Sequence, residues 1–512
     1  MRRWFPDHRC LFAASLIFSA VLGYFAQLPL WHTDLWGHLS FGRLIWESGA
    51  LPEQEPFLLL ADERALVDTA WLSQLILYAT EYQFGVGGLQ FGFGLVIAFI
   101  CTIFFVAGYR VTGHLLACLV GTGLLLWLEW VQIEIIRPQL AGTALFVLLL
   151  CRFQFPPRRD LLWWLPPILV FWANLHGSFI MGVGLTGAWF LAMVIDSIRT
   201  ERNLTRWIAC PDILLTGLLL VVAMLVPLIN PYGIGLYKDV VTFSNNPNLY
   251  DLVEWQPLTL KMQQGRSALV VSLILIFLWR RNRNAISTYH LLLLVVLGIA
   301  TLLNSRMIVW WAPVAAMETV RQLEGYWGDW CRWKSESDLN SPRALWTALG
   351  LLIASGTLVV TAGTRSDARV GDAIRDGQIR SDLRQAVSDQ TPLELTHFLH
   401  QKLASAEKPY RMLNSMVWGD FLIYALDGRQ PVFVYSHVHI TPRDVWLEYR
   451  NLLQLRAVWL ARLDERKIDL IVLDRRQHRA ACAGLRTSPR WNEIYADARG
   501  AIFERATDAQ AD

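Results

Sequence analysis

The chain has 512 residues, of which 54% are hydrophobic and 17% charged, and it contains 24 tryptophans. This composition excludes an ordinary soluble globular protein and is typical of a polytopic membrane protein. The 46 basic and 43 acidic residues leave a formal net charge of +3, which gives no reason to expect a nucleic-acid partner.

Long apolar segments recur from the amino terminus onward. The first follows "MRRWFPDHR" and is longer than a signal-peptide core, so we interpret it as a retained span. Because a hydrocarbon core of about 30 Å needs roughly 20 apolar residues per helix, the sequence predicts about eleven transmembrane helices. We expect them near residues 10–30, 87–108, 114–132, 138–151, 161–174, 178–196, 211–229, 267–279, 288–303, 306–320 and 343–363.

The arginine-rich loops predict the orientation of these helices. With a cytoplasmic amino terminus, clusters such as "RFQFPPRR" (152–159) and "RRNR" (280–283) fall on the cytoplasmic side, as the positive-inside rule requires. Segment 69–85 then has to be a helix in the outer interface, because counting it as a span would invert every later loop.

A polar segment follows the last expected span. We predict a transmembrane module over 1–363, with a first outer loop at 31–86, and a small extracytoplasmic α/β domain over 364–512. In this domain, we expect strands at 430–440 and 467–474, an amphipathic helix at 443–465, a closing hairpin at 491–505 and a connector at 365–392.

The first outer loop contains "TDLWGHLSFGRLIWESG" (33–49), which is unusually polar for its position. If it is helical, Asp34 and His38 stand four residues apart and share one face. Asp34 alone is equally well explained as the cap of the helix that follows.

Further polar residues fall at the outer ends of the spans, where they can mark a cavity. Each also has a structural explanation: a local ion pair, a turn, or an arginine that reaches the headgroups. The residues are Glu134, Arg137, Asn174, His176, Asn230, Tyr232, Lys238, Glu254, Trp255 and Arg306.

These polar residues suit an enzyme that transfers a group from a lipid-linked donor. A carboxylate above the membrane, here Asp34, can act as general base on an acceptor hydroxyl or hold a divalent metal through hard oxygen ligands. Arginines and lysines can bind the phosphate of a lipid carrier, and Arg137, Arg306 and Lys238 are the candidates.

At these residues the chain resembles the GT-C glycosyltransferases, which include the oligosaccharyltransferase catalytic subunit and protein O-mannosyltransferases. It is similar to a group of bacterial membrane proteins whose first outer loop carries a DxWWHL motif. Further matching segments are "WLSQLILY" (71–78), Arg137-Pro138, "WANLHGSF" (172–179), "NPYG" (230–233), "EW" (254–255) and "RMLNSMVWGDFLIYAL" (411–426).

The resemblance implies a polyprenyl-phosphate or polyprenyl-pyrophosphate sugar as donor and an acceptor hydroxyl or amide at the outer face of a bacterial inner membrane. It places the catalytic acid on Asp34, with His38 beside it, and a second acid on Glu134 or Glu129; Asp34 and Glu134 would hold Mg²⁺ or Mn²⁺ if a metal is used. It implies an acceptor pocket formed by His176, Asn174, Asn230, Tyr232, Glu254, Trp255 and Asp420.

Two other classes of protein stay open at this stage. A transporter or flippase of a lipid-linked saccharide would need a polar path through the bilayer midplane, and the spans hold few charges there. A catalytically silent scaffold would need only the outer domain. The acceptor is not identified by the sequence.

Overall fold

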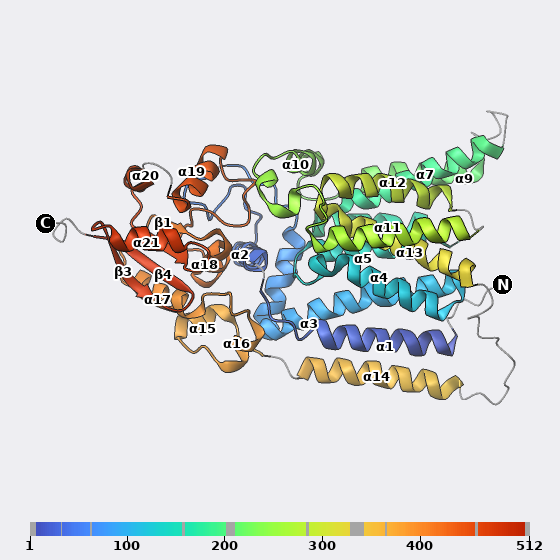
Figure 1. Cartoon of the computed structure of the whole chain (residues 1–512), viewed down its shortest axis with the longest axis horizontal. Coiled ribbons are helices and arrows are strands. Elements are labelled where there is room, and N and C mark those ends of the chain that lie inside the picture. Colours follow the sequence, from blue (N-terminus) through green and yellow to red (C-terminus); the bar gives the residue numbers. More distant parts are fainter. Residues whose placement is uncertain are drawn as a thin grey trace. The chain divides into compact units, whose positions relative to one another are not determined.

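The computed structural model describes residues 7–31, 33–61, 64–155, 159–200, 210–282, 286–327, 343–363, 366–455 and 459–506. The chain is mostly helical, with one four-stranded sheet (Figure 1). It divides into two compact units. Unit 1 comprises Met1–Leu28, Phe91–Tyr237 and Leu252–Thr364, and unit 2 comprises Pro29–Gln90, Lys238–Asp251 and Arg365–Asp512. Two stretches that precede residue 363 therefore group with the C-terminal part of the chain.

Unit 1 is a bundle of apolar helices. Each of the eleven expected spans overlaps one of them, with some helix ends lying beyond the expected bounds: α1 (His8–Phe25), the second part of α3 (Trp71–Thr112), α4 (Leu115–Ile133), α5 (Gln139–Arg152), α6 (Leu161–Leu175), α7 (Phe179–Thr200), α9 (Pro211–Leu225), α11 (Gln263–Arg281), α12 (Thr288–Leu303), α13 (Ile308–Trp327) and α14 (Arg343–Gly363). Short 3₁₀ turns lie at η1 (Val226–Leu228), η3 (Val253–Trp255) and η4 (Ser305–Met307).

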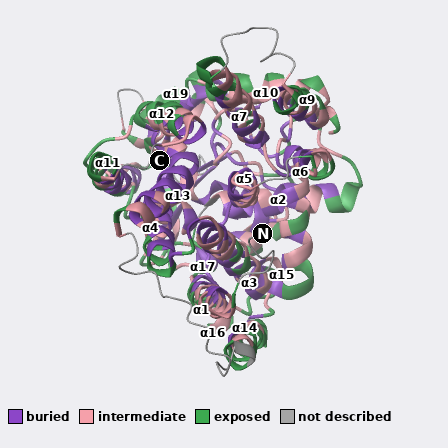
Figure 2. Ribbon diagram, turned by 90° about the vertical axis from the view of Figure 1, so that its right-hand side faces the viewer, coloured by how far each residue is buried: buried purple, intermediate pink, exposed green. Residues whose placement is uncertain are grey.

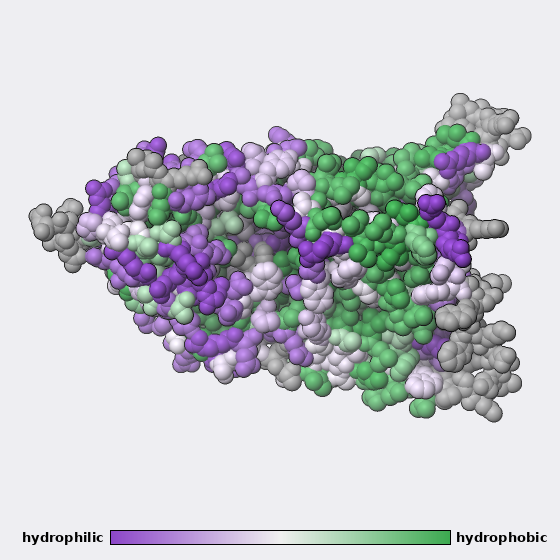
Figure 3. Space-filling model, in the orientation of Figure 1, coloured by the Kyte–Doolittle hydropathy of each residue, from purple (hydrophilic) through white to green (hydrophobic). Residues whose placement is uncertain are grey.

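Among the described residues, six helices are long and apolar enough to cross a membrane, and α5, α6 and α12 are shorter apolar helices. The protein is thus a multi-pass membrane protein, whereas the total of eleven spans stays a prediction. Hydrophobic side chains cover much of the surface formed by the unit 1 helices in Figure 3.

Helix α13 forms the centre of unit 1. It is buried along most of its length and packs against α4, α5, α11 and α12 (Figure 2). A helix that is apolar on all sides is stable only when neighbours surround it. By contrast, α14 packs mainly on α1 and leaves residues such as Leu352 and Val359 exposed, as expected for a helix that faces lipid.

Helix α3 is broken at Gly85. This glycine has φ 64° and ψ −166°, a conformation outside the helical region that a side chain would strain. The next two backbone N–H groups, of Val86 and Gly87, donate to the carbonyls of Ala368 and Ser366. The expected separation of 69–85 from the following span is confirmed, because the chain changes direction at this residue.

Unit 2 contains the sheet. Its order is β1 (Met412–Asn414), β2 (Leu470–Asp474), β4 (Gly500–Arg505) and β3 (Trp491–Ala496), with β1 parallel to β2 and the other pairs antiparallel. Its helices are α2 (Thr33–Ser48), the first part of α3, α15 (Val370–Asp376), α16 (Ser381–Ala386), α17 (Leu393–Ala404), α18 (Met416–Ala425), α19 (Arg443–Leu453), α20 (Trp459–Glu465) and α21 (Arg479–Thr487). Helix α10 (Ile234–Ser244) begins in unit 1 and ends in unit 2, followed by η2 (Leu249–Asp251).

The first outer loop shares the hydrophobic core of unit 2. Phe41 and Phe57 belong to one buried cluster with Trp418, Leu422 and other residues of the C-terminal part. Arg43 fastens α2 from the side, because its guanidinium donates to the Asp427 carboxylate (2.6 Å) and the Tyr424 carbonyl (2.7 Å). Residues almost 400 positions apart in the sequence therefore form one core.

Several expectations for the C-terminal part need correction. Segment 430–440 is not a strand: it is irregular and joins a ladder only through isolated bridges at Val432. Expected helix 443–465 is two helices, α19 and α20. The connector 365–392 contains α15 and α16, whereas the strand within 467–474 and the hairpin at 491–505 are confirmed as β2 and β3–β4.

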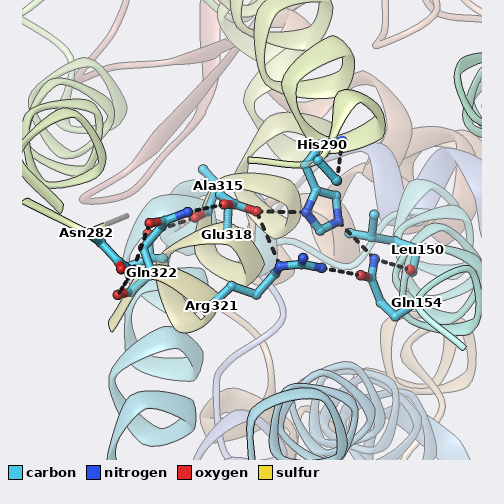
Figure 4. A network of polar contacts seen from close by, with 10 residues as sticks. Leu150, Gln154, Asn282, His290, Ala315, Glu318, Arg321 and Gln322 are labelled. Carbon is cyan, nitrogen blue, oxygen red and sulfur yellow. Dashed lines mark hydrogen bonds and ion pairs between the residues drawn. The ribbon is translucent and has the colours of Figure 1, made fainter. Parts of the chain in front are cut away.

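A buried polar network lies at the end of unit 1 where α5, α11 and α13 end and α12 begins (Figure 4). His290 Nδ1 lies 2.7 Å from Glu318 Oε2, and both side chains are 1% exposed. Gln322 donates to the other oxygen of Glu318, while Gln154 contacts His290 Nε2 at 2.9 Å and accepts from Arg321. Because each carboxylate oxygen has a partner, the pair is well satisfied in the apolar interior.

The close approach of α2 to α3 predicts that Gly42→Ala destabilises unit 2. A Cβ at this position would lie 2.2 Å from the Gln74 carbonyl oxygen, which is main chain and cannot move aside cheaply. We expect a loss of about 2 kcal/mol, measured by chemical unfolding in detergent. Gly371→Ala in α15, where nothing lies within 4 Å, is the matched control and should unfold like the wild type. Equal stabilities would contradict the packing.

The network of Figure 4 predicts that Glu318→Ala costs about 3 kcal/mol, because it leaves His290 and Arg321 without their shared carboxylate in a buried place. The matched control is Glu465→Ala, which removes an exposed carboxylate paired with Arg462 and should change stability by less than about 0.5 kcal/mol. If both variants unfold alike, the network does not stabilise the bundle.

Candidate functional site

Asp34 and His38 lie on helix α2, in the first turn and one turn later, and both are partly exposed. The helix begins at Thr33, so the carboxylate of Asp34 lies near its positive end. Gly37, between them, faces α18: a Cβ there would be 2.1 Å from Asp420 Oδ1. The glycine at this position thus lets α18 bring Asp420 close to α2.

Asp420 is fully buried and accepts two hydrogen bonds from Ser436, one from the backbone N–H at 3.0 Å and one from the hydroxyl at 2.7 Å. Burial, and after it the negative charge of Asp34, raises the pKa of Asp420 well above its usual value. The two carboxyl groups are therefore unlike: Asp420 is fully buried and has a raised pKa, whereas Asp34 is partly exposed.

In the same region of unit 2, side chains from the loop that follows α18 form a series of hydrogen bonds. Tyr435 donates its hydroxyl proton to Glu55 Oε2 (2.7 Å), and its oxygen lies 3.1 Å from His437 Nδ1. Since the one hydroxyl proton is already donated, His437 must donate from Nδ1, which leaves Nε2 as an acceptor. Burial lowers the pKa of His437 to about 4, with the charge of Asp34 opposing the shift, so this ring is neutral at pH 7.

His38 has its own support. Gln74 Nε2 lies 3.3 Å from His38 Nδ1 and donates to Asp68 Oδ1 at 2.9 Å. The rings of His38 and His437 are 6.1 Å apart, centroid to centroid. Unit 2 thus gathers one partly exposed carboxylate and two histidines, and each histidine is held by a second polar residue.

Two of the predicted phosphate-binding residues, Arg137 and Arg306, lie together in unit 1. Arg137 Nη1 donates to Glu254 Oε2 at 2.9 Å, and Arg306 Nη1 donates to Glu254 Oε1 at 3.0 Å. Arg306 also donates from Nε and Nη2 to Gln139 Oε1, and its guanidinium lies 5.4 Å from the centre of the Trp255 ring. One carboxylate therefore holds two guanidinium groups side by side.

His176 lies beside this pair, between α6 and α7. Its Nδ1 accepts from the backbone N–H of Ser178 (3.0 Å), which places the proton of the neutral ring on Nε2. Burial, and then the positive charges of Arg306 and Arg137, lower the pKa of His176 to about 3. At neutral pH it offers a hydrogen-bond donor without adding charge.

Three of the expected pocket residues have local structural contacts. Asn174 donates to the carbonyls of Val170 and Ile229 and so joins the end of α6 to the end of η1. Asn230 donates to Pro227 and accepts from the backbone of Tyr232 in a turn. These contacts support the structural explanation for the two asparagines.

The structure thus brings together Arg137, Arg306, Glu254, Trp255 and His176 within unit 1, and Asp34, His38 and Asp420 within unit 2. Glu134 ends α4 in unit 1, where burial raises its pKa, and Lys238 is exposed on α10 in unit 2.

Metal binding by Asp34 and Glu134 stays a prediction. They belong to different units, and across the described ranges no group of three or more His, Cys, Asp or Glu side chains could hold a metal ion. Both oxygens of Asp420, the carboxyl group beside Asp34, accept hydrogen bonds from Ser436.

Sequence reasoning missed the residues that support the site, namely Gln74, Asp68 and Gln139, and it did not indicate that Asp420 lies in helix α18. A polar residue in the first turn of an apolar helix was the available signal for Gln139 and Gln74. Nothing in the sequence indicated that Asp68 would be buried against Gln74.

No family model and no curated protein matches this sequence. Among solved structures it is similar to the Archaeoglobus fulgidus oligosaccharyltransferase in the apo form, with 12% identity, a TM-score of 0.51, and coverage of 91% of this chain and 69% of that one. ArnT from Cupriavidus metallidurans bound to undecaprenyl phosphate matches with 14% identity, a TM-score of 0.50, and coverage of 98% of both chains. Its apo state matches with 13% identity, 97% coverage of both chains and the same TM-score.

These similarities extend over nearly the whole chain, and they show that the protein has a GT-C-like fold. The expected fold family is confirmed. At identities this low the similarity concerns the fold, and the chemistry has to be argued from the residues.

The buried carboxyl group of Asp68 predicts a pH-dependent stability. Burial raises its pKa from 3.8 to about 7, so between these values the folded protein retains a proton that the unfolded chain has lost, and stability falls as the pH rises. Asp68→Asn, which keeps an oxygen acceptor for Ala70 and Gln74, removes this loss.

We therefore expect Asp68→Asn to match the wild type in thermal unfolding at pH 4 and to exceed it at pH 8. Asp376→Asn, at an exposed position of α15, should follow the wild type at both values. Parallel curves for the wild type and Asp68→Asn would show that Asp68 does not carry this shift.

Proposed function

We propose that this protein is a membrane glycosyltransferase that moves a sugar from a polyprenyl-phosphate or polyprenyl-pyrophosphate donor to an acceptor hydroxyl or amide. The observation that carries the proposal is the pair Arg137 and Arg306, held side by side at the helix ends of a chain with a GT-C-like fold. Two guanidinium groups at one place are a strong binding site for a phosphate oxygen pair. The similar ArnT structure is bound to undecaprenyl phosphate, which supports a lipid-linked donor.

In this mechanism the arginines bind the phosphate and stabilise it as it leaves, and the Nε2–H of His176 adds a neutral donor. Asp34 accepts a proton from the hydroxyl or amide of the acceptor molecule. The oxygen or nitrogen of that group attacks the anomeric carbon of the donor sugar. The bond from that carbon to the phosphate oxygen breaks, and the polyprenyl phosphate leaves with the electron pair. The Nε2 atom of His437, which can accept a hydrogen bond, and the ring of His38 orient the attacking group of the acceptor molecule.

Asp34 suits the role of base because it is the partly exposed carboxylate of its cluster, whereas Asp420 is fully buried and has a raised pKa. We place the reaction at the outer face of a bacterial inner membrane, with the amino terminus in the cytoplasm and unit 2 outside. The acceptor is a protein, a lipid or a glycan.

The test is release of free polyprenyl phosphate from polyprenyl-linked sugars by the purified protein, with crude membrane extract as the source of acceptor. Asp34→Asn should lower turnover about a hundredfold or more, since it removes the general base. Asp376→Asn, an equal change of charge at an exposed position of unit 2, should leave turnover unchanged. Treatment with EDTA in the same assay tests the predicted requirement for Mg²⁺ or Mn²⁺.

Full turnover by Asp34→Asn would exclude Asp34 as the base and direct attention to Glu134. If the folded wild-type protein turns over no donor, the enzyme hypothesis fails. Movement of the lipid-linked sugar across vesicles without its cleavage would then support a flippase.

A further inference from the structure

Glu254 occupies the position between the two arginines that a phosphate would need. Its two oxygens are each bonded to a different guanidinium, at 2.9 Å to Arg137 and 3.0 Å to Arg306. A carboxylate and a phosphate present a pair of oxygens to arginine in much the same way. In the absence of a ligand, the carboxylate of Glu254 therefore acts as an anion supplied by the protein itself.

Glu254 is also the member of the trio that can move aside. Its side chain is 29% exposed, compared with 8% for Arg137 and 21% for Arg306. Arg306 is fixed further by Gln139, which accepts from its Nε and Nη2, and by the Trp255 ring. A ligand that enters the site would thus contact Arg137 and Arg306 in their existing positions, and the carboxylate of Glu254 would rotate out of the site.

The main chain around Glu254 is anchored, so side-chain rotation is the available movement. The Glu254 carbonyl accepts from the Ser305 hydroxyl at 3.0 Å, and the Gln256 carbonyl accepts from the Ser305 N–H at 2.9 Å. The N–H of Leu258 donates to the carbonyl of Leu302. The displaced carboxylate accordingly remains at the rim of the site and continues to contribute its charge.

The charges of the site then select among phosphates. Two guanidinium groups and one carboxylate leave a formal charge of +1, and His176 is neutral because burial and the arginines lower its pKa to about 3. A phosphodiester carries one negative charge at neutral pH and balances this site. A pyrophosphate diester carries two, and the second would face the charge of Glu254.

We propose that Glu254 is a displaceable internal anion that holds Arg137 and Arg306 in place before the donor binds and makes the site selective for a lipid monophosphate over a lipid pyrophosphate. This inference rests on the proposed function, because it assigns the phosphate of the donor to the arginine pair. It narrows the donor to the class in which one phosphate joins the lipid to the sugar.

Two probes of defined charge test the selectivity: the methyl ester of farnesyl phosphate, with one negative charge, and the methyl ester of farnesyl pyrophosphate, with two. Binding to the full-length protein in detergent is measured by calorimetry at fixed ionic strength, because such contacts weaken with salt. We expect the wild type to bind the singly charged probe about tenfold more tightly.

Glu254→Gln removes the competing charge and keeps the shape of the side chain. We expect Glu254→Gln to bind both probes more tightly, by about threefold for the singly charged probe and by about tenfold or more for the doubly charged probe. The ratio of the two affinities should therefore become smaller than in the wild type. Asp212→Asn makes the same change of charge at an exposed position in the first turn of α9, and the binding site lies beyond the opposite end of that helix. It should bind both probes like the wild type.

The opposite results would overturn the proposal. Weaker or unchanged binding by Glu254→Gln would mean that Glu254 only supports the arginines, and a wild-type preference for the doubly charged probe would contradict the selectivity. If Glu254→Gln does not fold, Glu254→Asp replaces it: the shorter side chain keeps the charge, so the preference should persist while the singly charged probe binds more tightly. Binding of neither probe by folded wild type would instead contradict the proposed function itself.

Discussion

The packing of α2 against α18 is the contact on which the arrangement of unit 2 depends. Gly37 permits it, because any side chain at this position would meet the carboxyl group of Asp420. Trp36, fully buried beside this glycine, packs edge-on against Phe421 of α18, and Arg43 bonds to the far end of the same helix. This interface fixes where Asp34 and His38 lie, and it places a buried carboxyl group with a raised pKa next to the proposed base.

Neutral histidines with assigned proton positions are the second feature of the molecule. His176 in unit 1 and His437 in unit 2 have lowered pKa values because both are buried, and for His176 the nearby arginines lower it further. Their hydrogen bonds are opposite in sense: His176 accepts at Nδ1 from a backbone N–H, whereas His437 donates at Nδ1 to Tyr435. One ring thus offers a donor, suited to a phosphate, and the other an acceptor, suited to a hydroxyl or an amide proton.

Sequence periodicity and hydropathy located the helices of unit 1 well, because a helix in a membrane needs a continuous apolar segment and its own backbone hydrogen bonds. The break at Gly85 was anticipated from charge alone, since counting 69–85 as a span would have inverted the arginine-rich loops. The number of spans could not be fixed in this way, since α5, α6 and α12 are shorter than a bilayer requires.

The same reasoning was wrong where short apolar runs were ambiguous. In segment 430–440 apolar and polar residues alternate as in a strand. Tyr435 and His437 nevertheless lie outside the sheet: Tyr435 contacts Glu55, and the two residues contact one another. Segment 411–426, for which the sequence predicted no particular structure, contains the short strand β1 followed by helix α18, which packs against α2.

The sequence by itself determined a multi-pass membrane protein with a polar C-terminal part, and its motifs pointed to Asp34, Arg137 and Arg306. These follow from composition and local pattern, which need no knowledge of distant contacts. Only the tertiary structure decided that Glu254 bridges the arginines, that Asp420 approaches Asp34, and that Glu55 and Tyr435 set the proton of His437. The physical reason is that hydrogen bonds, ion pairs and burial depend on groups that are 50 to almost 400 residues apart in the chain, and no local pattern encodes which of them meet.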